Sequence, residues 1–246
     1  MYHFFVTQEQ IGEKEIRITG SDVNHIRNVL RMTPGVQISV SSRETGVEYR
    51  CEISAIEEDC VTAGIMWAQE ADTELPVKIY LFQGLPKGDK MEFIIQKAVE
   101  LGAYEIVPVA TKRAVVKLDG KKEASKRKRW NAISESAAKQ SKRTIVPEVR
   151  QVMSFREAVE YASSCRVKLI PYELAEGMEK TKEVIAGVRP GDSVAVFIGP
   201  EGGFDEAEIS CAAEAGVVPV TLGRRILRTE TAGMTMLSVL MFQMEQ

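Results

Sequence analysis

The sequence is poor in the residues that build metal and disulfide sites. Its 246 residues include four cysteines and two histidines. The cysteines form no CxxC pair and have no zinc-type spacing, and Cys51 and Cys60 could at most face each other across neighbouring strands. The four are Cys51, Cys60, Cys165 and Cys211. We therefore expect reduced thiols, as is usual in cytoplasm, and no bound metal.

Long apolar segments are also missing. No stretch approaches the roughly 18 apolar residues that a membrane helix needs. The first residues, MYHFFVTQEQIGEKE, lack the basic start and the apolar run of a signal peptide. We expect a cytoplasmic protein that makes no use of a membrane. The 44% hydrophobic and 27% charged residues are typical of a folded globular chain and argue against disorder.

Several common catalytic motifs are absent. The sequence has no GxGxxG fingerprint, no Walker P-loop and no serine-hydrolase spacing. Both histidines, His3 and His25, lie near the start, so the remainder of the chain has no histidine base. Chemistry there must depend on arginine, carboxylate, hydroxyl and backbone groups. This restricted set favours group transfer from a preactivated donor over hydrolysis or redox chemistry.

Positive charge is concentrated in one segment, although the formal net charge is -3. Between Thr111 and Arg143 there are twelve Lys or Arg and three acidic residues. The densest part, KKEASKRKRW, places basic residues beside Trp130, a composition typical of contacts with a phosphate backbone and an unstacked base. A solvated helix face is the alternative, and Trp130 could equally anchor its helix in the core.

The first 72 residues read as a small β-barrel. Short apolar alternations such as EIRI and VQISV are separated by turn residues. One helix interrupts them, with Ser21 or Asp22 as its N-cap. The residues expected on the apolar face of that helix are Val23, Ile26, Val29 and Leu30. A polar segment that closes with Pro76 puts the domain boundary between residues 72 and 73.

From residue 73 onward, strand and helix patterns alternate. This alternation predicts an α/β domain with a mostly parallel sheet and helices on both faces. In such sheets ligands bind where strands end and loops turn toward helices.

Two loops that follow apolar strands are unusual. IGPEGGF, residues 198–204, has three glycines, which permit positive φ and close approach of a ligand to the backbone. A tight turn before a helix capped by Asp205 would need fewer. LGRRILRTETA, residues 222–232, has three arginines, the natural partners of phosphate or carboxylate. Thr229 or Thr231 could cap the last helix, but a cap explains only one residue.

These loops, together with KGDKMEFIIQKAVELGA and AAKQSKRTIVP, closely resemble the SPOUT class of trefoil-knotted RNA methyltransferases. Within that class the chain resembles the bacterial family that methylates ring nitrogen 3 of a uridine in small-subunit ribosomal RNA. HIRNVLRM resembles the PUA-like RNA-binding barrel of the family. The resemblance implies a PUA-like β-barrel over residues 1–72 and a knotted α/β methyltransferase domain over residues 73–246. It also implies a homodimer that acts on small-subunit ribosomal RNA or the assembling small subunit.

The resemblance further implies which residues act. S-adenosylmethionine is expected to contact Gly199, Pro200, Glu201, Gly202, Gly203, Leu222, Gly223, Ile226, Leu227 and Arg228. Residues 169–172 are expected to complete this pocket. RNA is expected to contact His25, Arg31, Lys126, Arg127, Lys128, Arg129 and Arg143.

Four residues are candidates for catalysis in a transfer to uridine nitrogen 3. Arg143 or Arg228 would stabilise negative charge on the uracil oxygens, and Glu201 or Glu230 would take the proton if its pKa is raised. Arg143 follows Gln140 and Ser141 in a motif whose arginine acts across the family's dimer.

Three departures from the family and two alternative functions accompany these expectations. Ser136 stands where relatives usually have glutamate, with Glu135 one place off. His3 stands where relatives commonly have arginine, and Gly233 stands where a proline is frequent, so the entry to the last helix is expected to be looser. One alternative is methylation of a ribose 2′-hydroxyl. The other is a ribosome-associated RNA-binding protein without turnover.

Overall fold

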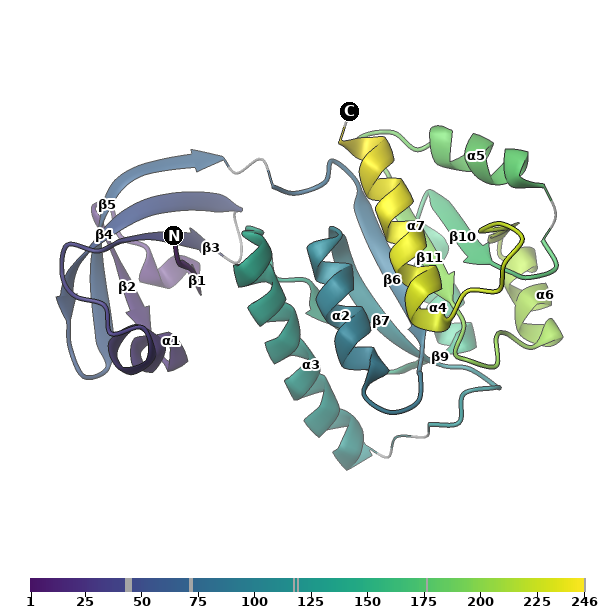
Figure 1. Ribbon diagram of the computed structural model, residues 1–246, viewed down its shortest axis with the longest axis horizontal. Coiled ribbons are helices and arrows are strands. Elements are labelled where there is room, and N and C mark those ends of the chain that lie inside the picture. Colours follow the sequence, from purple (N-terminus) through teal and green to yellow (C-terminus); the bar gives the residue numbers. More distant parts are fainter. Residues whose placement is uncertain (43–45, 71–72, 117, 119, 176, 246) are drawn as a thin grey trace. The chain divides into compact units, whose positions relative to one another are not determined.

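The computed structural model describes residues 1–42, 46–70, 73–116, 118, 120–175 and 177–245. The chain divides into two compact units (Figure 1). The first consists of Met1–Glu74 and Ala138–Val146, and the second of Leu75–Ala137 and Pro147–Gln246. Sequence patterns gave no sign that Ala138–Val146 belongs with the first unit.

The first unit contains a five-stranded sheet in the order β1-β3-β4-β5-β2. β1 pairs with β3 in parallel, and the other neighbours are antiparallel. Because β1 and β2 are the two edge strands, the expected barrel is a curled half-barrel, and the PUA-like fold is confirmed. The strands are β1 (His3–Val6), β2 (Glu15–Thr19), β3 (Gln37–Ser42), β4 (Val47–Ile56) and β5 (Cys60–Glu70).

Alternating side chains fill the core of this sheet. In β2, Ile16 and Ile18 are buried while their neighbours in the strand are exposed. In the strand register Cys51 lies opposite Ile65 and Cys60 lies opposite Thr19, so the two cysteines do not face each other. All four cysteines are free thiols.

The helix expected after Ser21 is shorter than its sequence pattern suggests. α1 (Ser21–Asn24) continues into a π-turn, η2 (His25–Val29), which is closed by the Leu30 N–H donating to the His25 carbonyl at 2.8 Å. The wider turn moves later residues off the apolar face. Val29, expected on that face, is 64% exposed, so that assignment was wrong.

The second unit is built on a parallel sheet in the order β12-β10-β11-β6-β7-β8, and β9 also pairs with β7. All of its pairings are parallel, which confirms the expected α/β domain. The strands are β6 (Lys78–Gly84), β7 (Ala103–Ala110), β8 (Glu148–Val149), β9 (Met153–Ser154), β10 (Val167–Pro171), β11 (Ser193–Ile198) and β12 (Val218–Val220).

Helices cover both faces of this sheet. Phe82 and Phe197 stack with centroids 4.5 Å apart in the cluster that also contains the buried faces of α4 and α6. The helices α2 and α7 lie side by side and pack on β6, β7 and β11 (Figure 1). The helices are α2 (Lys90–Glu100), α3 (Gly120–Ser141), α4 (Phe155–Tyr161), α5 (Met178–Ala186), α6 (Glu206–Glu214) and α7 (Thr229–Met244), and the short 3-10 turns are η1 (Gln8–Gln10) and η3 (Ala162–Ser164).

Capping residues fix where two of these helices begin. Ser154 and Glu157 form a capping box at α4, and Asp205 and Glu208 form another at α6, as expected of Asp205. Over the described part of the chain, no helix is both long enough and apolar enough to cross a membrane. The knot that the family resemblance implies stays a prediction.

Gly233 has room for a side chain. It lies within α7, and a Cβ there would meet Gln83 Oε1 at 3.7 Å and Ile198 Cγ1 at 3.8 Å, which are ordinary contact distances. Gly233→Ala should therefore raise the free energy of unfolding by about 0.5–1 kcal/mol, because glycine is the more costly residue inside a helix. Urea unfolding measures this change. Gly84→Ala is the matched control and should destabilise, because its Cβ would lie 2.7 Å from Pro200.

His3 makes the stability of the first unit depend on pH. Its side chain is 7% exposed, Ser39 Oγ lies 3.0 Å from Nδ1, and Nε2 has no hydrogen-bond partner among the described residues. Burial lowers the pKa of His3 from 6.5 to about 4. Between pH 6.5 and pH 4 the unfolded chain binds a proton at His3, whereas the folded protein does not.

Stability should therefore fall as the pH drops from 6.5 to 4 and be insensitive to His3 above that range. His3→Gln should remove up to about 3 kcal/mol of this pH dependence, as measured by chemical unfolding at several pH values. His25→Gln, which removes an exposed histidine of the same unit, is the control variant. Equal pH dependence in the wild type and His3→Gln would contradict the assignment.

Candidate functional site

The carboxyl ends of β10, β11 and β12 surround a cavity of about 490 Å³ in the second unit. This volume lies in the range of small-molecule sites, roughly 300–1,000 Å³. Three loops line it, residues 171–173, 198–204 and 221–229, together with Lys90, Arg113 and Ala232. The carboxyl edge of a parallel sheet is where ligands bind in this type of fold.

The structure brings all ten predicted cofactor residues to this cavity. They are Gly199, Pro200, Glu201, Gly202, Gly203, Leu222, Gly223, Ile226, Leu227 and Arg228. Ile226, expected to contact the cofactor, is 87% exposed and so lies at the rim. Of residues 169–172, only Pro171 and Tyr172 line the cavity, because Leu169 and Ile170 are buried in the sheet.

We call residues 198–204 the glycine loop. Its three glycines serve different purposes. Gly203 adopts a φ of 66°, which side chains rarely tolerate. Gly199 allows close approach, since a Cβ there would lie 3.1 Å from the Gly203 Cα. A Cβ at Gly202 would lie 3.2 Å from the Cβ of Arg113. The loop is therefore packed closely against the residues that follow β7.

A buried chain of hydrogen bonds fastens the glycine loop to the start of α7. The Thr229 hydroxyl donates to the Gly199 carbonyl at 2.6 Å, and Gln83 Nε2 donates to Thr229 Oγ1 at 2.8 Å. The N-cap position of α7 is Arg228, so neither Thr229 nor Thr231 caps this helix. Sequence analysis missed Gln83, which lies 146 positions away from Thr229.

Glu201 is held by donors from the loop after β6 and from the first residue of α2. Its carboxylate accepts from the Lys87 N–H at 3.1 Å and from Lys90 Nζ at 2.9 Å. Burial raises the pKa of Glu201, but the hydrogen bonds from Lys90 and from the backbone outweigh burial and hold that pKa below its ordinary value. Glu201 therefore lacks the raised pKa that a role as general base requires.

Glu230 differs from Glu201. Its Oε2 lies 3.6 Å from Lys90 Nζ and, within the described residues, this buried oxygen accepts no hydrogen bond. Lys90 is thus shared between the two glutamates. Lys90 lies in the segment KGDKMEFIIQKAVELGA that supports the family resemblance, but no role had been assigned to it.

Arg143 is engaged within the first unit. It is 3% exposed, and its Nε donates to Glu74 Oε2 at 3.0 Å. The Thr144 N–H donates to the same carboxylate at 2.9 Å. A role in catalysis or RNA binding would require this guanidinium to leave Glu74, and that role stays a prediction.

The basic residues predicted to bind RNA lie on α3. Arg127, Lys128 and Arg129 are exposed, and Arg129 Nη2 forms an ion pair with Glu92 at 2.7 Å. Lys126 lies over the ring of Trp130 at 5.9 Å. Trp130 itself is 2% exposed, so it anchors the helix in the core and is not available to stack on a base.

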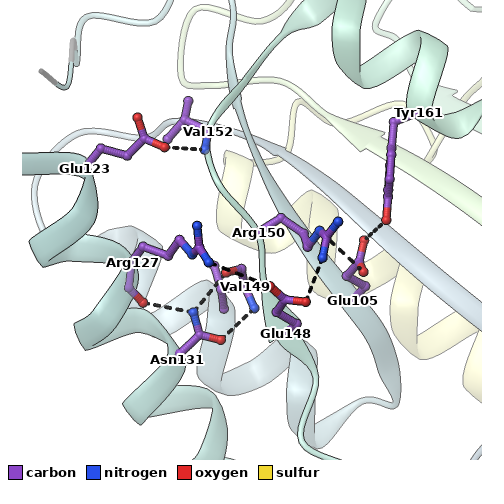
Figure 2. A network of polar contacts seen from close by, with 9 residues as sticks. All are labelled: Glu105, Glu123, Arg127, Asn131, Glu148, Val149, Arg150, Val152 and Tyr161. Carbon is purple, nitrogen blue, oxygen red and sulfur yellow. Dashed lines mark hydrogen bonds and ion pairs between the residues drawn. The ribbon is translucent and has the colours of Figure 1, made fainter. Parts of the chain in front are cut away.

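Polar contacts hold α3 against the chain around β8 (Figure 2). Asn131 donates to the Val149 carbonyl at 2.9 Å and accepts from the Val149 N–H at 3.0 Å. Glu123 accepts from the Val152 N–H at 2.9 Å. Arg127 approaches Glu148 at 4.0 Å from the same side. Lys121 and Lys128 are exposed on the same helix.

The remaining predicted RNA contacts, His25 and Arg31, lie in the first unit. Both are exposed, and Arg31 has a left-handed φ of 50° at the end of the π-turn. In the part of the chain that the structure describes, no group of three or more His, Cys, Asp or Glu residues could hold a metal ion.

This fold and site define an RNA methyltransferase with a PUA domain. The family model described as an RNA methyltransferase domain matches residues 73–241, and the model of the RNA methyltransferase PUA domain matches residues 18–66. Ribosomal RNA small subunit methyltransferase E of Bacillus subtilis is 41% identical, over 99% of this chain and 96% of that protein. The chain belongs to the ribosomal RNA small subunit methyltransferase E family.

Two further relatives support this family assignment. The protein of the same name from Mesomycoplasma hyopneumoniae is 33% identical, over 97% of this chain and 98% of that protein. The crystal structure of a ribosomal RNA small subunit methyltransferase E from Neisseria gonorrhoeae is 32% identical, with a TM-score of 0.86 over 98% of this chain and 97% of that one. That protein is bound to S-adenosyl methionine. The family predicted from the sequence motifs is confirmed.

Proposed function

We propose that this protein transfers a methyl group from S-adenosylmethionine to ring nitrogen 3 of a uridine in small-subunit ribosomal RNA. The observation that carries this proposal is the convergence of both motif loops on one cavity at the carboxyl edge of the sheet. Membership of the family and the bound S-adenosyl methionine of the Neisseria relative support the donor. The names of the relatives support the substrate class.

The cavity has the features that a nucleoside-containing donor needs. Gly199, Gly202 and Gly203 line the cavity without side chains of their own, so a ligand can approach backbone groups there. Leu222 and Leu227 offer apolar surface in the same lining. When bound, S-adenosylmethionine supplies an electrophilic methyl group. The protein's task is then to bring the uracil nitrogen into line with it.

The nitrogen must lose its proton before it can attack. Arg228 lines the cavity with an exposed guanidinium, which can stabilise negative charge as it develops on a uracil oxygen. Glu201 and Glu230 both stay candidates for the base. Glu201 lines the cavity but accepts hydrogen bonds from Lys87 and Lys90, whereas Glu230 accepts none from the described residues at Oε2 but lies 3.6 Å from Lys90 Nζ and outside the cavity lining.

RNA binding is assigned to both units. The candidates are His25, Arg31, Lys126, Arg127, Lys128 and Arg129, with Arg143 of a second copy acting near the base in the predicted homodimer. On α2 and α7, Phe93, Val239 and Phe242 expose apolar surface that suits such a second copy. Because nitrogen 3 lies on the pairing edge, the target uridine must be unpaired or turned out of its helix.

The test uses purified protein, S-adenosylmethionine labelled in its methyl group, and either naked small-subunit ribosomal RNA or small subunits. Digestion to nucleosides should place the label on N3-methyluridine. A label on the ribose 2′-oxygen would indicate the alternative methyltransferase. RNA binding without any label would indicate a binding protein without turnover.

Gly202→Val should impair donor binding. The β-branched side chain would start 3.2 Å from Arg113 Cβ, so either the glycine loop or Arg113 must move. We expect the affinity for S-adenosylmethionine to fall at least tenfold in calorimetric titration, which corresponds to about 1.4 kcal/mol. Gly233→Ala, a change in the same unit with room for its side chain, is the control. Wild-type affinity in Gly202→Val would refute the pocket assignment.

A further inference from the structure

The lining of the cavity carries more positive than negative charge. Its cationic side chains are Lys90, Arg113, Arg224, Arg225 and Arg228, and its anionic side chains are Glu173 and Glu201. Lys90 is compensated by Glu201 at 2.9 Å and by Glu230 at 3.6 Å. Arg113 donates to the Gly202 carbonyl at 3.1 Å and lies 4.0 Å from Asp205.

The three arginines after β12 are different. Arg224, Arg225 and Arg228 are exposed, and none of their side chains forms a hydrogen bond or an ion pair with a described residue. Guanidinium groups kept together without counterions repel one another. This surplus of positive charge favours an anionic ligand over a cationic one.

The methyl donor does not account for this surplus charge. S-adenosylmethionine carries a sulfonium and an ammonium group against one carboxylate, so its overall charge is positive. Its carboxylate can engage one guanidinium, and further arginines would repel the rest of the molecule. With Arg228 assigned to the reacting uracil, Arg224 and Arg225 have no partner within the reaction.

The loop that carries these arginines has a fixed base. Thr181 of α5 is 4% exposed, donates to the Thr221 carbonyl at 3.1 Å and accepts from the Thr221 N–H at 3.1 Å. Thr221 Oγ1 in turn accepts from the Gly223 N–H at 3.2 Å, and Gly223 has a φ of 108°. The chain therefore leaves β12 in a defined direction, and the next residues project outward.

Ile226 adds an apolar contact to this tip. An isoleucine that is 87% exposed, directly after two unpaired arginines, gives a short segment with two charges and one apolar side chain. This composition matches a strand of nucleic acid, whose phosphates alternate with apolar sugar and base faces. The segment 224–226 is referred to below as the rim segment.

We propose that Arg224 and Arg225 clamp the phosphodiester backbone of the RNA next to the target uridine, with Ile226 against an adjoining sugar or base. This inference rests on the proposed function, since it assumes an RNA substrate at the cavity. Arginine suits the task because its planar guanidinium binds two phosphate oxygens at once. The clamp contributes to RNA binding, whereas donor binding and methyl transfer depend on other residues of the cavity.

The test compares two double variants with the same change in net charge. Arg224→Ala with Arg225→Ala removes the clamp. Lys180→Ala with Lys182→Ala removes two exposed cations from α5, outside the cavity lining. Binding of transcribed small-subunit ribosomal RNA is measured at several salt concentrations without donor, S-adenosylmethionine binding is measured by calorimetry, and KM for RNA and kcat are measured separately.

Loss of the clamp should weaken RNA binding about tenfold or more at low salt and reduce the salt slope by about 1.4–1.8, since each phosphate contact contributes roughly 0.7–0.9. KM for RNA should rise by a similar factor, while kcat at saturating RNA and donor affinity stay near wild type. The α5 control should keep the wild-type slope. Arg224→Lys with Arg225→Lys should recover the salt slope but only part of the affinity.

Two results would overturn the proposal. An unchanged salt slope and RNA affinity in the alanine variant would mean that the rim segment does not meet phosphate. A loss of donor affinity without a change in the salt slope would place the arginines in the donor site. Wild-type protein that binds RNA but transfers no methyl group would refute the proposed function alone, because the donor-free binding measurement tests the clamp independently.

Discussion

The site depends on one buried hydrogen bond, from the Thr229 hydroxyl to the Gly199 carbonyl. It joins the first turn of α7 to the first glycine of the loop after β11, and Gln83 supports it from β6. Thr229 is 5% exposed and Gly199 is half-buried, so breaking this bond would leave the buried hydroxyl without its acceptor, at a cost of about 1–3 kcal/mol. The two loops that the motifs identify as separate strings thereby become opposite walls of one cavity.

Charge inside the cavity is arranged around this junction. Lys90 satisfies Glu201 and reaches Glu230, so the charges beside the glycine loop largely compensate one another. The arginines after β12 stand at the outer edge of the cavity without counterions among the described residues. This contrast in charge suits a cationic small molecule beside the glycine loop and an anionic polymer beside the arginines. The loop after β12 can then contact both the methyl donor and the RNA, because its first residues line the cavity and its tip is exposed to solvent.

Sequence patterns predicted the features that depend on residues close together in the chain. The parallel α/β domain, the Asp205 cap and the gathering of glycine and arginine at strand ends all follow from periodicity and turn chemistry. These patterns did not predict the roles of Gln83, Lys90 or Arg113, because their partners lie from 89 to 146 positions away. Val29 was misplaced because a π-turn changes the helical period without a signal in the sequence. Trp130 could be assigned only once its burial was known.

The return of Ala138–Val146 to the first unit has a practical meaning for anyone who dissects this protein. The polypeptide passes between the units three times, so neither unit is a continuous stretch of the gene. A fragment cut at residue 72 would lose both Glu74 and Arg143, which are paired within the first unit. A separable half would have to be assembled from two pieces of chain, for example by joining residue 74 to residue 138 through a short linker, or by circular permutation.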